Sequence, residues 1–364
     1  MKIAMTGAGG FVGWHTRAYL HSIGERDVHA FAVGSAFDAS AANVAVSGSD
    51  RLLLIAGVNR GSDDEVRDGN LLFAEQAAVA LRAAEAPPRL VVFASSTQVG
   101  NGSVYGQAKH EASEVVRVAA EAVGARFVDL RLPNLFGEHG RPFYNSVTAT
   151  FCHLLSRGER PSVEIDNTLS LLHVQHAVEA LVEGSPSSVL EPHVTVSSVS
   201  SLLSTLSTFA EAYGRGDVPA LRSDFERDLF NTYRSFAFEV STSLDLRQNA
   251  DDRGSFIEVI RSHGGSGQTS FSTTVPGVTR GQHYHRRKME RFTVLAGSAD
   301  IRLRRLFSDD VVTVSVDGDR PCSVDMPTFW AHSITNTGDD VLYTMFWSNE
   351  IFDPAAPDTI PETV

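Results

Sequence analysis

Short apolar runs and longer segments with helical spacing alternate along the first half of the chain. The short runs are typical of buried strands and cover residues 2–5, 28–33, 51–57, 89–94 and 127–131. The helical segments lie between them, at residues 14–22, 71–84 and in a stretch that ends near residues 123–124. Because strands that alternate with helices form βαβ units, we predict a doubly wound parallel sheet of the Rossmann type.

The pattern changes after about residue 194. A Ser-rich stretch, 197–207, precedes a segment, 209–238, that has a helical or irregular pattern. From residue 251 onward the chain consists of short β-like runs separated by turn residues such as Pro276-Gly277 and Gly297. Many short strands with frequent turns predict an all-β barrel or jelly roll.

The chain length also favours two domains, since 364 residues are long for one. We place the boundary between residues 240 and 250, which divides the chain into domains 1–245 and 246–364. Residues 354–364 are predicted to form a tail that lies on the surface.

Charge and composition exclude several classes of protein. A net charge of −13 argues against a nucleic-acid or anionic-membrane partner, whose phosphates would be repelled. The two cysteines, Cys152 and Cys322, form no disulfide framework and fit a reducing compartment. No run of 18 apolar residues is present, so we predict a cytoplasmic protein without membrane insertion.

A glycine-rich loop follows the first predicted strand and opens the first helix. Gly7 allows a tight turn, Gly10 lets the backbone approach a pyrophosphate, and Gly13 permits close packing of the helix on the sheet. Phosphates bind well at a helix N-terminus. The loop therefore indicates a dinucleotide site, although glycine in one strand–turn–helix is a weak signal by itself.

A second group of residues suggests proton transfer. Tyr105 and Lys109 are four residues apart and so share one face of a helix. An ammonium beside a phenol lowers the pKa of the phenol, which can then exchange a proton with a carbonyl or alcohol. Ser96 ends a predicted strand, where its hydroxyl can orient the same oxygen.

These residues resemble the extended short-chain dehydrogenase/reductase family, and residues 131–137, RLPNLFG, match a segment of its nucleotide-sugar site. The resemblance implies a catalytic triad of Ser96, Tyr105 and Lys109, with Asn70 either completing a proton relay or packing within its helix. It also implies cofactor-binding residues, Gly7, Gly10, Phe11, Val12, Gly13, Ala56, Asn70 and Lys109, and substrate-binding residues, Arg131, Asn134, Tyr144 and Asn145. No carboxylate follows Ser96, so ketone reduction or alcohol oxidation fits better than dehydration.

The second half contains a candidate metal site. His283 and His285 point to the same face of a strand, and Glu290 and His332 come from later strands. Their spacing, with Gly277 and Gly297 at its ends, resembles the first cupin motif, and Pro327 to Asn336 resembles most of the second. Phe329 stands where that family usually has glycine. Three imidazoles and a carboxylate suit Zn²⁺ or another divalent transition metal.

A reductase followed by a cupin (jelly-roll) barrel resembles the CapF-type bifunctional enzymes of capsular polysaccharide synthesis. The resemblance extends to local segments of this chain: 54–60, 144–147, 225–229, 252–256 and 352–354. The resemblance implies that the cupin epimerises C3 of a UDP-2-acetamido-2,6-dideoxy-4-ketohexose. The first domain then reduces C4 with NADPH, giving a UDP-N-acetyl-6-deoxy-L-talosamine-type sugar. It also implies a homodimer or higher homo-oligomer. Epimerisation must come first, because reduction removes the ketone that acidifies the C3–H.

Two points stay open. Residues 33–35, Val-Gly-Ser, contain neither an acidic residue for an NAD ribose nor an arginine for an NADP phosphate, so NADH remains an alternative to NADPH. The chain could also be a UDP-sugar 4-epimerase, or a ketoreductase of another sugar pathway, with the cupin as a structural or dimerisation module.

Overall fold

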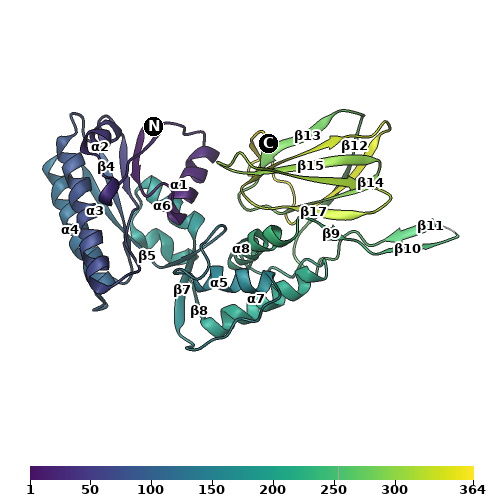
Figure 1. Ribbon diagram of the computed structural model, residues 1–364, viewed down its shortest axis with the longest axis horizontal. Coiled ribbons are helices and arrows are strands. Elements are labelled where there is room, and N and C mark those ends of the chain that lie inside the picture. Colours follow the sequence, from purple (N-terminus) through teal and green to yellow (C-terminus); the bar gives the residue numbers. More distant parts are fainter. Residues whose placement is uncertain (253) are drawn as a thin grey trace. The chain divides into compact units, whose positions relative to one another are not determined.

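The computed structural model describes residues 1–252 and 254–364, so Arg253 of the segment 252–256 lies outside the described residues (Figure 1). The chain forms two compact units. Unit 1 comprises Met1–Phe136, Gly140–Ser146 and Asn167–Ser198. Unit 2 comprises Gly137–His139, Val147–Asp166 and Val199–Val364. Residues 199–245, predicted to belong to the first domain, lie in unit 2. The domain boundary near residue 245 stays a prediction.

Unit 1 contains a five-stranded parallel sheet in the order β2-β1-β3-β4-β5. Its strands are β1 (Ile3–Thr6), β2 (Val28–Ala30), β3 (Arg51–Leu54), β4 (Leu90–Ser96) and β5 (Arg126–Leu132). The neighbours of β1 run to opposite sides, so the strand order reverses there. In open α/β sheets, ligands bind at this switch point, outside the carboxyl ends of the strands.

Helices cover both faces of this sheet. On one face α2 (Ala39–Val46), α3 (Asp63–Ala83) and α4 (Val104–Ala122) bury an alanine-rich core, and α3 lies beside α4 (Figure 1). On the other face α1 (Phe11–Ser22) packs against α6 (Val174–Glu183). The predicted Rossmann-type fold is therefore confirmed.

The remaining elements of unit 1 are short. A three-stranded sheet consists of β6 (Asn134–Phe136), β7 (Thr168–His173) and β8 (Thr195–Ser198). Two short 3-10 helices span Gly34–Ala36 and Ser187–His193.

Three helices of the middle segment belong to unit 2: α5 (Val147–Ser156), α7 (Val199–Gly214) and α8 (Asp224–Val240). Every residue of α8 from Asp228 to Phe238 is buried, polar ones included. A helix buried on all sides packs against neighbours all round. Its neighbours include α5, α7 and the barrel, whose core Phe238 enters against Trp330. The segment predicted as helical or irregular is thus helical.

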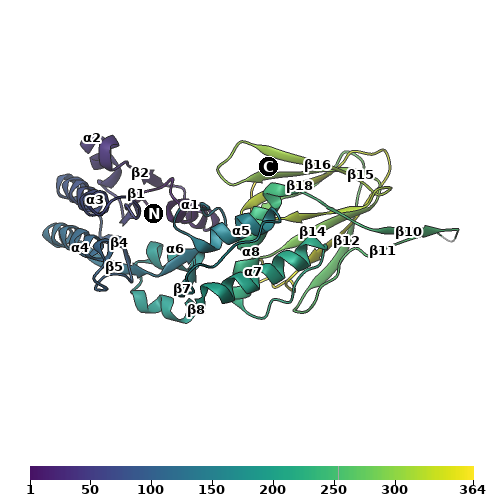
Figure 2. The same ribbon diagram turned by 60° about the horizontal axis from the view of Figure 1, so that its bottom comes forward.

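The barrel consists of two five-stranded antiparallel sheets, which Figure 2 shows stacked. One sheet contains β9 (Leu244–Asp245), β12 (Gln268–Thr274), β14 (Glu290–Ala296), β17 (Cys322–Met326) and β19 (Leu342–Ser348). The other contains β13 (Thr279–Tyr284), β15 (Ser298–Arg305), β16 (Val311–Asp317), β18 (Trp330–Asn336) and β20 (Ile360–Pro361). A hairpin, β10 (Gln248–Asp251) with β11 (Gly254–Ile257), lies between β9 and β12 in the chain. The predicted all-β barrel is confirmed.

The C-terminal tail lies on the surface of the barrel and is attached to it. Its strand β20 pairs with β13, so that Pro361 lies opposite His283 and Ile360 opposite Tyr284. Arg304 holds the end of the tail through Glu362, with 2.6 Å between guanidinium nitrogen and carboxylate oxygen.

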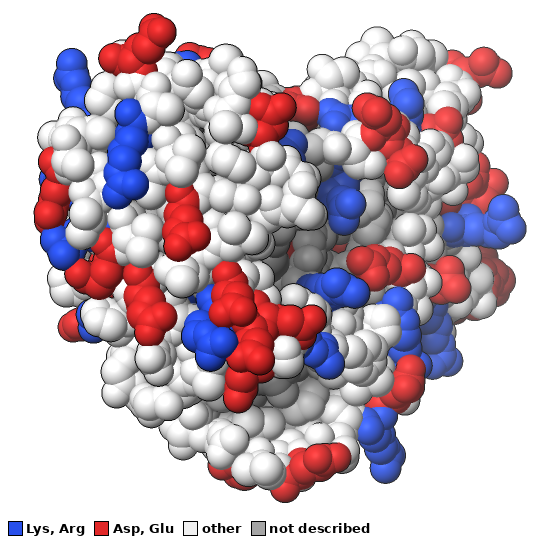
Figure 3. Space-filling view, turned by 60° about the vertical axis from the view of Figure 1, so that its left-hand side comes forward, with Lys and Arg blue, Asp and Glu red and all other residues white. Residues whose placement is uncertain are grey.

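Acidic and basic side chains are interspersed on the face of the molecule in Figure 3, where no broad basic stripe is visible. Among the described residues, no helix has the length and apolar character that crossing a bilayer requires.

A buried charge cluster joins α7 and α8 to the barrel. The carboxylate of Asp325 on β17 accepts two hydrogen bonds from Arg291 on β14, of 2.6 and 3.1 Å. The Tyr213 hydroxyl of α7 donates a third at 2.9 Å, and a guanidinium nitrogen of Arg234 on α8 lies 3.6 Å away. Burial by itself would raise the pKa of Asp325, but the two arginines hold it below its usual value.

Replacing Asp325 by asparagine tests this cluster. Asp325→Asn keeps the shape but leaves two buried guanidiniums without their anion, and we expect a loss of about 3–5 kcal/mol of stability. Urea unfolding followed by the fluorescence of Trp330 and Trp347 measures it. Asp339→Asn, an exposed substitution before β19, should change stability by no more than about 0.5 kcal/mol. Equal stability of Asp325→Asn and the unchanged protein would contradict this account.

The lowered pKa also fixes the direction of the pH dependence. A depressed carboxyl pKa contributes stability above the unfolded value of about 3.9, and this contribution is lost as the pH falls through the folded value. The difference in stability between the unchanged protein and Asp325→Asn should therefore shrink below about pH 4.

Candidate functional site

The glycine-rich loop lies at the switch point of the sheet, between β1 and α1. Gly10 is the N-cap of α1, and no acidic residue occupies its first turn, which contains Phe11, Val12 and Gly13. Gly13 packs so closely on the loop that a Cβ there would overlap the carbonyl oxygen of Gly7. The first turn of a helix presents backbone N–H groups without partners in the helix, and these bind phosphate.

The wall facing this loop comes from the end of β3. The hydroxyl of Thr6 accepts hydrogen bonds from the backbone N–H groups of Ile55 and Ala56, at 3.1 and 3.2 Å. Ala56 is therefore held beside the loop, as the resemblance implies. Thr6 itself was not predicted, since a threonine at the end of a strand carries no distinctive signal.

The predicted triad comes from β4 and α4. Ser96 is the last residue of β4, and Tyr105 and Lys109 lie one turn apart on α4. A Cβ on Gly106 would overlap the carbonyl oxygen of Gln98, so glycine allows α4 to approach the loop that follows Ser96. The packing thus brings the start of α4 close to the end of β4.

Lys109 is buried beside the end of β3. Its ammonium lies 4.3 Å from the centre of the Phe93 ring and next to Gly57. Asn70 reaches the same glycine from α3. The Asn70 amide nitrogen donates to the carbonyls of Val58 and Val66 at 2.6 and 2.7 Å. Asn70 therefore fixes the loop after β3, in addition to any role in proton transfer.

Burial sets the protonation of this site. It raises the pKa of the Tyr105 phenol, which is the opposite of the lowering expected from a neighbouring ammonium. It also lowers the pKa of Lys109 to about 8, against a smaller opposing effect of Asp129. Near neutral pH the phenol is thus protonated and able to donate, and the amine is mostly charged.

The predicted substrate residues fall into two groups. Tyr144 and Asn145 lie on a loop that packs against residues 59–60: the Asn145 amide donates to the carbonyl of Asn59 at 3.1 Å. Arg131 on β5 pairs with Asp129 at 3.2 Å, and the amide of Asn134 on β6 donates to the carbonyl of Ser170 at 3.3 Å.

Two arginines flank Tyr144 and were not predicted as site residues. The Arg60 guanidinium lies 5.6 Å from the centre of the Tyr144 ring and donates to the carbonyls of Phe143 and Tyr144. Arg141 lies 5.0 Å from the same ring. Only the fold shows that Arg60 contacts Tyr144, because the two residues are 84 apart and local sequence contains no signal for that contact.

In unit 2, the four predicted metal ligands converge. The ligand atoms of His283, His285, Glu290 and His332 all lie within 4.8 Å of one another. One oxygen of Glu290 is 3.1 Å from the Nε2 of His285 and 3.5 Å from that of His332. The same oxygen is 3.9 Å from His283 Nε2. The β-sheet places three of them, since His283 on β13 pairs with His332 on β18 and Glu290 begins β14. His285, which the sequence placed on the same strand as His283, instead follows the end of β13.

The hydrogen bonds of two imidazoles suit metal binding. His285 Nδ1 lies 2.6 Å from the carbonyl oxygen of Asp358, and His332 Nδ1 lies 3.2 Å from that of Trp330. A carbonyl only accepts, so each Nδ1 carries the proton and each Nε2 presents a lone pair. Both Nε2 atoms are buried without a hydrogen-bond partner. Such buried, unsatisfied nitrogens fit a bound cation.

The charge states agree with this fit. Burial lowers the pKa of His332 to about 4, which keeps the imidazole neutral. Burial alone would raise the pKa of Glu290, but the three imidazoles close to its carboxylate hold it far below its usual value. The residues thus provide three imidazole nitrogens and one carboxylate, a typical set for Zn²⁺.

The ligands open into a cavity of about 980 Å³, mouth included. It is lined by polar and aromatic side chains, among them His283, Lys288, Glu290, Phe346, Trp347 and Phe352. The Lys288 ammonium lies 3.1 Å from the second oxygen of Glu290. The site is therefore accessible to a molecule larger than water.

Phe329 has the left-handed backbone conformation that favours glycine, the residue usual at this position of the cupin motif. Its φ is +64°, in the left-handed region that a bulky residue rarely adopts. Its N–H donates to the carbonyl of His285 at 2.8 Å, and its own carbonyl accepts from Leu306. The departure from the cupin motif thus leaves the path of the chain beside His285 and His332 intact.

Comparisons with known proteins cover the whole chain. The NAD dependent epimerase/dehydratase family matches residues 3–183, and the polysaccharide biosynthesis C-terminal domain matches residues 249–360. The UDP-2-acetamido-2,6-beta-L-arabino-hexul-4-ose reductase of Pseudomonas aeruginosa is 34% identical, over 99% of this chain and 98% of its own. The capsular polysaccharide assembling protein CapF of Staphylococcus aureus is 34% identical over 100% of both chains, with a TM-score of 0.64.

The chain belongs to the CapF-type family. This confirms the resemblance stated from the sequence. A partial relative, the spore coat polysaccharide biosynthesis protein SpsL of Bacillus subtilis, is 28% identical over 31% of this chain and 81% of its own. Membership of the CapF-type family makes this an NAD(P)-dependent UDP-sugar enzyme.

Metal content tests the cluster directly. We expect about one Zn²⁺ per chain in the unchanged protein, because the three imidazoles and the carboxylate converge on one place. Removing His332, a buried ligand, should abolish stoichiometric binding, whereas His29→Ala, in the exposed pair with Asp27, should leave it unchanged. Elemental analysis after dialysis against Zn²⁺ measures this. Full zinc content in His332→Ala would show that these residues do not form the site.

Proposed function

We propose that this protein is a bifunctional enzyme: its barrel epimerises C3 of a UDP-2-acetamido-2,6-dideoxy-4-ketohexose, and its N-terminal unit reduces the C4 ketone. The observation that carries the proposal is the 34% identity over 99% of the chain with a reductase of such a 4-ulose sugar. The convergence of the four metal-ligand candidates in an open cavity supports the epimerase half.

Epimerisation needs an acidic C–H and a place for negative charge. The C3–H is acidic because the anion left behind is delocalised onto the C4 carbonyl oxygen. A divalent cation held by His283, His285, Glu290 and His332 would supply Lewis-acid stabilisation of that oxygen. The carbonyl oxygens of Asp358 and Trp330 hold the Nδ1 protons of His285 and His332, so that both Nε2 atoms face the cation. The Phe346, Trp347 and Phe352 side chains line the cavity beside it.

Reduction needs a hydride and a proton. NADPH, or NADH, would supply the hydride when bound at the loop Gly7 to Gly13. The raised pKa of Tyr105 keeps its phenol protonated, so that it can donate the proton to the C4 oxygen as the alcohol forms. Lys109 carries positive charge next to this site, and Ser96 provides a hydroxyl to orient the oxygen.

The substrate is a dianion bound by an acidic protein, so it needs local positive charge. Arg60 and Arg141 supply it beside Tyr144, which can stack on a planar base. We therefore propose that these arginines, with Asn145, Arg131 and Asn134, hold the UDP part of the substrate.

Removing the metal ligands should block inversion and leave the cofactor site intact. The double variant His285→Ala with Glu290→Ala should bind NADPH as before but give no C3-inverted product, because its ketone oxygen loses the stabilising cation. Mass and NMR analysis of products from the 4-keto UDP-sugar, with and without NADPH, measures this. Inverted product at undiminished rate would overturn the assignment.

Removing the Tyr105 hydroxyl should separate the two activities. Tyr105→Phe should lower the reduction rate by about 10²–10⁴-fold, the usual contribution of general acid catalysis. Exchange of the C3 hydrogen with deuterated solvent should continue, because it depends on the barrel. Tyr343→Phe, an exposed change on β19, is the matched control. If exchange also stopped in Tyr105→Phe, the assignment of epimerisation to the barrel and reduction to the N-terminal unit would be wrong.

The same product analysis separates this function from the alternatives. A UDP-sugar 4-epimerase consumes no net NADPH. A ketoreductase with a structural barrel would reduce the ketone without inverting C3.

A further inference from the structure

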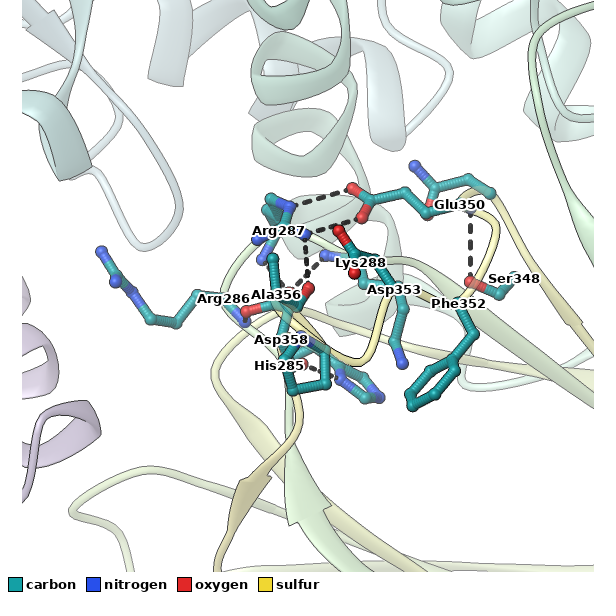
Figure 4. Close-up of polar contacts among 12 residues, drawn as sticks. His285, Arg286, Arg287, Lys288, Ser348, Glu350, Phe352, Asp353, Ala356 and Asp358 are labelled. Atoms are coloured by element: carbon teal, nitrogen blue, oxygen red, sulfur yellow. Dashed lines mark hydrogen bonds and ion pairs between the residues drawn. The ribbon is translucent and has the colours of Figure 1, made fainter.

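The C-terminal tail contributes a residue to the metal site that lies outside the cupin motifs. Asp358 follows β19 by ten residues and precedes β20. Figure 4 shows it beside His285 and beneath the turn that carries Arg286, Arg287 and Lys288. None of the proposed ligands lies within 20 residues of Asp358 in the sequence.

Asp358 makes four hydrogen bonds to the segment that links two proposed ligands. One carboxylate oxygen accepts from the N–H of Arg286 at 3.1 Å. The other accepts from the N–H groups of Arg287 and Lys288, at 2.9 and 2.8 Å (Figure 4). The backbone carbonyl of Asp358 accepts from His285 Nδ1 at 2.6 Å. A single residue therefore accepts the hydrogen bonds of the N–H groups in the turn and also orients the His285 imidazole.

The backbone conformation of Asp358 links the position of its carbonyl group to the contacts of its side chain. Its φ is +44°, in the left-handed region that non-glycine residues rarely adopt. Such a conformation persists only where surrounding contacts hold it. The three N–H groups bound by the carboxylate are the contacts that hold it, so the position of the carbonyl against His285 depends on the side chain.

The turn held by Asp358 also presents Lys288 to Glu290. Lys288 is 9% exposed. Its ammonium lies 3.1 Å from Oε1 of Glu290, whereas the imidazoles lie against Oε2, and it donates to the Thr359 hydroxyl at 3.3 Å. Thr359 is the neighbour of Asp358 in the tail. The tail thus contacts both His285 and, through Lys288, the ligand Glu290.

We propose that Asp358 is a positioning residue of the metal site: it fixes the tautomer and orientation of His285 and the turn between His285 and Glu290. The inference rests on the proposed function, since it concerns the cation that this function needs. Carbonyl and carboxylate partners of metal-ligating histidines generally raise metal affinity about 10–100-fold. The epimerase site is therefore completed by the last residues of the chain.

The test measures metal binding rather than catalysis. Asp358→Ala should bind Zn²⁺ about 10–100-fold more weakly than the unchanged protein, in competition with a chromophoric chelator. The visible spectrum of the Co²⁺-loaded protein should also change, because it reports ligand geometry. Asp358→Asn keeps one acceptor oxygen and should lose less affinity than Asp358→Ala.

Glu362→Ala is the matched control. It removes another attachment of the tail, the pair with Arg304, without touching the turn, and should leave Zn²⁺ affinity and the Co²⁺ spectrum unchanged. Equal loss in Glu362→Ala would mean that the tail acts only as a structural strand, and would overturn the proposal. So would unchanged affinity in Asp358→Ala, or in Asp358→Asn if the alanine variant does not fold. Failure of the unchanged protein to bind Zn²⁺ would instead refute the proposed epimerase site.

Discussion

The alternation of side chains along β14 is the constraint on which unit 2 depends. Successive residues of a strand point to opposite faces, so Glu290 and Arg291 point in opposite directions. Glu290 points to the three imidazoles, and Arg291 enters the buried cluster with Asp325, Tyr213 and Arg234. One pair of adjacent residues therefore presents a metal ligand and fastens the barrel to α7 and α8. The barrel and the helices α5, α7 and α8 therefore form one compact unit.

Burial gives the two sites the protonation states that their chemistries need. In the barrel, it keeps His332 neutral, as a metal ligand must be, while the imidazoles keep Glu290 ionised. In unit 1, it keeps the Tyr105 phenol protonated, as a proton donor must be. The same desolvation, applied to an imidazole and to a phenol, thus keeps the imidazole neutral for a cation and keeps the phenol protonated.

The sequence predicted what local spacing encodes. The glycine loop, the Tyr105–Lys109 pair and the His283–His285 pair each span only a few residues, so spacing along the chain reveals them. It did not reveal Asp358 or Arg60, because their contacts join segments from 70 to more than 80 residues apart along the chain. It could not assign α8 to the barrel either, since the polar residues buried there are satisfied only by tertiary partners. The pKa of Tyr105 was expected to fall, but desolvation by burial raises it.

The two proposed reactions determine the origin of the hydrogens at C3 and C4 of the product. The direct measurement is a reaction of the 4-keto UDP-sugar in deuterated water with unlabelled NADPH, followed by NMR of the product. We expect solvent deuterium at C3, from proton removal and return in the barrel, and cofactor-derived hydrogen at C4. A product with the substrate's own hydrogen at C3 would contradict epimerisation by this protein, and deuterium at C4 would contradict reduction by direct hydride transfer.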